Sequence, residues 1–136
     1  MRPCVALRVV AACALAVTAF GPTPVRALDN PLRVNLRGAT SHLQVAAATI
    51  FGSGSNVLVD VTRYRDVLNG AAVTLNTGSC GNPGSIAFQL SPFTKVGSIT
   101  ELRSSIADVA AHARSMIIYQ TASVKSAAFA CGNVIN

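Results

Sequence analysis

The sequence predicts a mainly β domain, a Greek-key β-sandwich with one short helix. The first observation behind this prediction is a series of seven or eight short segments in which apolar and polar residues alternate, with turn residues between them. The second is a pair of cysteines, Cys80 and Cys131, whose spacing allows a bridge between a long loop and the last strand. One segment after Ser105 has helical spacing instead, and it supplies the helix.

Three strands are expected in the first half of the domain. Residues 32–37 place Leu and Val at every second position between Arg and Asn, which is the pattern of a half-buried strand. Residues 42–51 are apolar and polar in turn, and the Gly- and Ser-rich stretch 52–56 after them indicates a turn. Valines then recur at every second position across 57–62, which indicates the next strand.

Two further strands and a long loop follow. Asn69-Gly70 is a strong signal for a tight turn. Residues 71–76 after it are expected to form a strand. A loop containing Gly and Pro spans 78–84, and residues 85–90 have the composition of a strand again.

The region 99–117 is ambiguous, because apolar residues recur there at helical spacing. Ser105 and Asp108 fit a capping box, with a hydroxyl at the cap and a carboxylate three residues later. We therefore predict a short helix from Ile106 to near Arg114, while the residues just before Ser105 stay open to a strand. Two apolar segments complete the series of strands: 116–119 and 126–135.

The amino end has the order of a secretory signal peptide. Two arginines precede an uncharged apolar run over 9–20, and small residues precede a cleavage point after Ala27. We expect residues 1–27 to be removed and 28–136 to form one secreted or periplasmic domain. The apolar run is shorter than the roughly 20 residues that cross a bilayer, so no membrane span is expected after processing. Two alternatives stay open, a retained anchor and a lipoprotein signal ending at Cys13.

The charge of the mature domain argues against one class of partner. Eight Lys and Arg stand against five Asp and Glu, which gives a net charge of +3 after cleavage. These charges are scattered along the chain, there is no Trp, and aromatic residues are few. Nucleic-acid binding requires a basic stripe with aromatic platforms, so nucleic acid is not expected as a partner. The sequence does not identify another partner.

Cys80 and Cys131 are the two cysteines that remain after processing. An even pair in an oxidising compartment most simply forms a disulfide. The bridge would close a loop of 51 residues, which is worth about 4 kcal/mol before any strain is subtracted. The rival interpretation is a metal site with two Cys ligands. Such a site needs further Cys or His ligands at suitable spacing, and the sequence shows none.

No catalytic or cofactor-binding motif is legible. His42 falls in an expected strand and His112 in the expected helix, and neither belongs to a local motif. The sequence shows no Ser, His and Asp constellation and no spaced carboxylate pair of the glycosidase kind. No glycine-rich loop carries the Lys of a phosphate-binding loop. We therefore assign no catalytic residue, no metal and no cofactor.

Two short motifs around the cysteines resemble the Cu/Zn superoxide dismutases. The stretch 130–135, which begins Ala-Cys-Gly, is similar to that family's closing strand, and Gly78-Ser79-Cys80 follows the strand 73–76 where the family has its other bridging cysteine. The chain also resembles secreted bacterial relatives of the superoxide dismutase and chordin-type (CHRD) domains. The similarity covers about half of the mature chain, in Cys80, 84–90, 106–110, 116–120 and 130–135.

The resemblance implies a superoxide dismutase-like fold whose metal-binding histidines are replaced. The family's ligand positions fall on Thr74, Asn76 and Gln120, and these side chains are poor ligands for copper or zinc, which favour imidazole. The resemblance therefore implies a non-catalytic binding or structural module without a cofactor. The alternative is a metal-dependent enzyme or copper carrier, with superoxide dismutase activity, that uses His42, His112 and oxygen ligands.

Overall fold

The computed structural model describes residues 30–65 and 67–135. The expected signal peptide, its cleavage point and Cys13 lie outside these residues. Within the described ranges, no helix is both long and apolar enough to cross a membrane.

Eight strands and one short helix make up the described chain. In order they are β1 (Leu32–Gly38), β2 (Gln44–Ser53), β3 (Asn56–Arg63), β4 (Val73–Asn76), β5 (Ile86–Leu90), β6 (Gly97–Leu102), α1 (Ile106–His112), β7 (Ser115–Tyr119) and β8 (Ala128–Ile135). The predicted cap at Ser105 is present, since its hydroxyl accepts a hydrogen bond of 3.0 Å from the Asp108 N–H, while the Asp108 carboxylate accepts from the Ser104 hydroxyl at 2.6 Å. The mainly β fold with one short helix is therefore confirmed.

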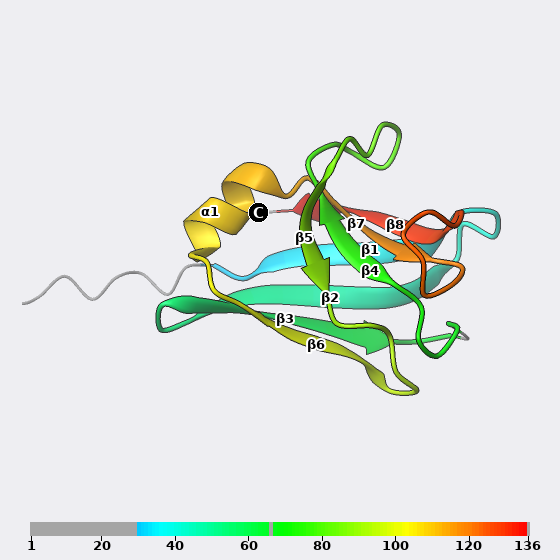
Figure 1. Ribbon diagram of the computed structural model, residues 1–136, viewed down its shortest axis with the longest axis horizontal. Coiled ribbons are helices and arrows are strands. Elements are labelled where there is room, and N and C mark those ends of the chain that lie inside the picture. Colours follow the sequence, from blue (N-terminus) through cyan, green and yellow to red (C-terminus); the bar gives the residue numbers. More distant parts are fainter. Residues whose placement is uncertain (1–29, 66, 136) are drawn as a thin grey trace, which may run out of the picture.

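All eight strands belong to one antiparallel sheet, in the order β5-β4-β7-β8-β1-β2-β3-β6. The sheet curls so that its two end strands, β5 and β6, approach each other and nearly close a barrel (Figure 1). Side chains bridge the seam: the Ser91 N–H donates to Thr100 Oγ1 at 2.8 Å, and Ser98 Oγ donates to the Ser91 carbonyl at 2.6 Å. The predicted sandwich is thus a single sheet wrapped around one core.

The chain crosses between the two halves of the sheet three times, from β3 to β4, from β5 to β6 and from β6 through α1 to β7. Around the nearly closed ring, the four consecutive strands β4 to β7 lie side by side in the spatial order β7-β4-β5-β6. A strand that returns beside the first of three consecutive strands defines a Greek key, and β7 returns in this way beside β4.

The close approach of β3 and β6 requires glycine at position 97, where φ is +145° and a Cβ atom would collide with the Val61 carbonyl.

The core fills the inside of the barrel and is built by alternation. β1 buries every second residue, and β3 does the same with its valines. Ile106 and Val109 of α1 join this core, so the helix covers part of it. The largest side chains buried almost completely in the core are Phe93, Leu36, Ile50, Leu75, Met116 and Ile118.

Several boundaries differ from the sequence expectations, among them the starts of β4 at Val73 and of β8 at Ala128, each two residues later than expected. β2 begins at Gln44 because His42, expected in the strand, has a positive φ of 55° and belongs to the turn before it. The residues before Ser105, which the sequence leaves open to a strand, form β6. α1 ends at His112, two residues before Arg114, since Ala113 already has extended backbone angles at the cap.

Candidate functional site

The predicted Cys80–Cys131 disulfide is present, with the two Cα atoms 5.8 Å apart. It fixes the loop between β4 and β5 to strand β8. Two further contacts anchor the same loop: Ser115 Oγ donates to the Gly78 carbonyl at 2.6 Å, and the Cys80 N–H donates to Asn133 Oδ1 at 2.9 Å. The loop is therefore attached to β7 and β8 as well as to its own strands.

A buried polar cluster lies on the outer face of β4 and β7. Val73 and Leu75 point into the core, so Thr74 and Asn76 leave the opposite face of β4. Thr74 Oγ1 donates to Asn76 Oδ1 at 2.6 Å and lies 3.3 Å from the hydroxyl of Tyr119 on β7. All three side chains are buried. Two of the three expected ligand positions are thus brought together, and a tyrosine joins them.

Apolar side chains surround this polar cluster. Tyr119 packs in a second hydrophobic group, separate from the barrel core, with Ala72, Ile117, Val124, Ala128 and Cys131. The cluster therefore combines a hydroxyl, a carboxamide and a phenol in a closed apolar environment. These groups exchange hydrogen bonds with one another, and among the described residues no buried side-chain nitrogen or oxygen is left without a partner.

Gln120, the third expected ligand position, lies apart from the cluster. It is exposed, one residue beyond the end of β7, and its N–H donates to the Ala127 carbonyl at 2.9 Å. The pairing of β7 with β8 changes register between Ile118 and Tyr119. Sequence reasoning missed Tyr119, although its place in the apolar strand 116–119 marked it as buried.

The two histidines of the alternative hypothesis lie at different ends of the barrel. His42 is in the turn between β1 and β2, and His112 is in α1 at the opposite end (Figure 1). His112 Nδ1 lies 2.9 Å from the Asp108 carbonyl and 3.2 Å from a carboxylate oxygen of the same residue. In the part of the chain that the structure describes, no three His, Cys, Asp or Glu side chains gather where they could hold a metal ion.

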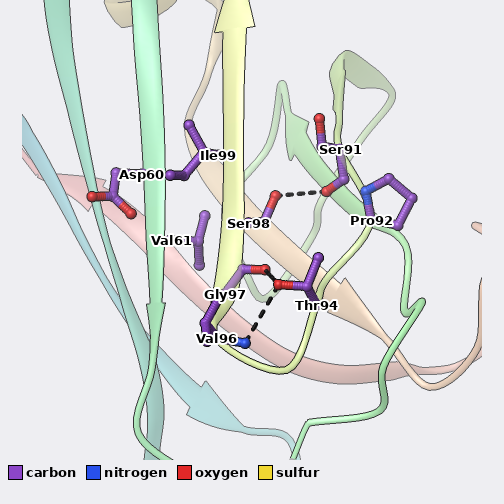
Figure 2. A pocket seen from close by; sticks show the side chains of 9 residues that line it. All are labelled: Asp60, Val61, Ser91, Pro92, Thr94, Val96, Gly97, Ser98 and Ile99. Atoms are coloured by element: carbon purple, nitrogen blue, oxygen red, sulfur yellow. Dashed lines mark hydrogen bonds between the residues drawn. The ribbon is translucent and has the colours of Figure 1, made fainter.

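An open hollow of about 330 Å³ lies beside the seam of the barrel (Figure 2). Thr94 Oγ1 donates to the Gly97 carbonyl at 2.7 Å, which shapes the loop that forms one wall. Val96 and Ile99 are 84% and 66% exposed, so the hollow has an apolar rim. The lining residues are Asp60, Val61, Ser91, Pro92, Thr94, Val96, Gly97, Ser98 and Ile99. Sequence reasoning missed this hollow because it arises where β3 meets the segment 91–99, which is distant from it in the sequence.

Comparison of the chain with protein-family models and with curated proteins finds no match.

Proposed function

We propose that this chain is an exported, secreted or periplasmic domain of the superoxide dismutase-like type that serves as a binding or structural module and performs no copper redox chemistry. The observation that carries the proposal is the buried Thr74–Asn76–Tyr119 cluster. It lies beside Cys131, which is bridged to the anchored loop, and it includes two of the positions where the resemblance expects metal-binding histidines.

The chemistry of these side chains favours a structural role for the cluster. Copper and zinc sites in proteins favour imidazole and thiolate ligands, whereas hydroxyl and carboxamide oxygens are weak ligands for them. A metal ion at this place would also have to replace the 2.6 Å hydrogen bond between Thr74 and Asn76. A buried network in which every member has a partner makes the surrounding structure rigid. The cluster therefore acts as a polar connection between β4 and β7.

The disulfide supports the proposed compartment. Disulfides form and persist outside the reducing cytosol, and Cys80–Cys131 is compatible with an oxidising environment. Removal of residues 1–27 would deliver the domain there with the bridge intact. The anchored loop and the hydrogen-bonded Thr74–Asn76–Tyr119 cluster then stabilise an exported domain, and its outer surface is the part that would bind a partner.

Metal analysis of the exported protein tests the proposal. The full chain is expressed with its own amino-terminal segment, the protein is purified from the periplasm, and its copper and zinc are measured by elemental analysis. A superoxide assay on the same sample follows. We expect far less than one metal ion per chain and no dismutation above the buffer rate. Stoichiometric copper together with dismutation would overturn the proposal and favour the metal-dependent alternative.

A further inference from the structure

The outer face of the strands β1, β2, β3 and β6 carries an ordered row of side chains. The core residues of these strands alternate with residues that point outward. Register pairs Arg33 with Thr49, Thr49 with Asp60, and Asp60 with Ile99. Neighbouring strands are about 4.8 Å apart, so Arg33 and Asp60 stand on either side of Thr49, roughly 10 Å from each other.

The two charges of this row have no partner in the described chain. Neither the Arg33 guanidinium nor the Asp60 carboxylate has a hydrogen bond or ion pair to another described residue. Asp60 is nevertheless half-buried, at the edge of the hollow described above, and Arg33 lines a second hollow of about 320 Å³. A half-buried carboxylate is stabilised by an opposite charge, and this row offers one charge of each sign.

We propose that this face is the interface of a symmetric dimer, with a second copy of this chain as its occupant. A two-fold axis that runs along β2 above Thr49 exchanges the two sides of the row. It places Arg33 opposite the partner subunit's Asp60, and Asp60 opposite the partner subunit's Arg33. A surface that is self-complementary in this way is what an isologous interface requires.

The shape and polarity of the face fit the same occupant. Ala47 and Thr49 are small side chains at its centre, so two sheets can approach to the packing distance of about 10 Å. Phe51 and Leu58 are paired across β2 and β3 and only partly buried, and Ile99 is 66% exposed. These apolar groups lie beside the charged row and would be buried in the dimer. Removal of their apolar surface from water favours association of the two subunits.

Charge exchange tests the proposal. Sedimentation velocity is run on the full-chain product, on Arg33→Glu, on Asp60→Arg, and on a mixture of the two variants. The unmodified protein is expected to dimerise, and each variant alone is expected to dissociate at least about tenfold more readily, because like charges then face each other twice. The mixture should recover the dimer, since both contacts become attractive again. Lys125→Glu, the same change of charge on a loop away from this face, should leave dimerisation unchanged.

The outcomes separate this inference from the proposed function. A protein that stays monomeric up to high concentration would overturn the inference, as would variants that dimerise normally alone or fail to associate when mixed. A circular dichroism spectrum equal to that of the unmodified protein shows that each variant is folded. Metal content does not enter this test, so the proposed function can fail while the dimer stands, and the reverse also holds.

Discussion

Thr74 occupies the centre of the buried polar cluster, and its single hydroxyl serves two neighbours. A hydroxyl has one proton, and Thr74 Oγ1 stands in donor geometry both to Asn76 Oδ1, at 2.6 Å, and to the Tyr119 hydroxyl oxygen, at 3.3 Å. Thr74→Val keeps the shape of the side chain but removes its hydroxyl, so Asn76 Oδ1 and the Tyr119 hydroxyl lose a buried hydrogen-bond partner. We expect this substitution to lower the free energy of unfolding by about 1–3 kcal/mol. Thr62→Val, at an exposed site of β3, is the matched control. Urea denaturation measures both, and equal effects would contradict a special role for Thr74.

Three histidines placed in this cluster should bind metal. Thr74 and Asn76 leave the same face of β4, and Tyr119 meets them from β7. The triple variant Thr74→His, Asn76→His and Tyr119→His can bring three imidazoles to the usual bond length of about 2 Å, so we expect tight zinc binding by isothermal titration calorimetry. A second triple variant that carries Gln120→His in place of Tyr119→His should bind more weakly. If neither binds better than the unmodified protein, the alignment behind the resemblance is wrong.

Individual residues were predictable from the sequence only where a local pattern or the cysteine count decides their place. The pairing of Cys80 with Cys131 followed from cysteine count and compartment, and the structure confirms it. The choice between Tyr119 and Gln120 did not follow, because it depends on the register of β7 against β4, in which Thr74 pairs with Ile117 and Tyr119 leaves the same face as Ile117. A shift of one residue in a strand moves every side chain to the other face, and no local signal reports such a shift.

Among the elements, strands with one exposed face were the most predictable. β1 buries every second residue, and its alternation was visible in the sequence. In β4 and β7 every residue is buried, because the barrel core lies on one face and the second hydrophobic group with its loops covers the other. Alternation is lost in such strands, so composition alone indicated them and their ends were less well defined.

The disulfide holds the loop between β4 and β5 against β8, and its removal should weaken this whole region. The bridge spans 51 residues, and a loop of that length is worth about 4 kcal/mol in the chain-entropy account. For a domain of this size we expect Cys80→Ser with Cys131→Ser to lower the melting temperature by roughly 10 °C or more. Calorimetry measures the change, and Ser79→Ala in the same loop is the control. An unchanged melting temperature would show that the other loop contacts suffice.

At the scale of the whole molecule, the fold class was predictable but the order of strands was not. Alternation and turn signals indicate how many strands a chain has, whereas the β5-β4-β7-β8-β1-β2-β3-β6 order depends on pairings far apart in the sequence. β1 and β8, for example, pair from the two ends of the domain. The hollow beside the seam depends on a pairing of the same kind, between β3 and β6, and no local pattern in the sequence indicates it.

Export and folding should depend on each other in this protein. The bridge between Cys80 and Cys131 needs an oxidising compartment, and residues 1–27 are expected to direct the chain there. We expect the full chain expressed in bacteria to yield a periplasmic product that starts at Leu28, with the mass of residues 28–136 less two hydrogens.

Deletion of residues 2–27 should leave the protein in the cytosol with both remaining thiols free, because the cytosol keeps cysteines reduced. Such a protein lacks the stabilisation of the bridge and should melt at a lower temperature until it is oxidised. Intact mass, thiol titration and a melting curve on both products test the dependence. A periplasmic product of full length, or one that carries lipid at Cys13, would contradict cleavage after Ala27. A cytosolic product that melts like the exported one would show that the fold does not depend on its compartment.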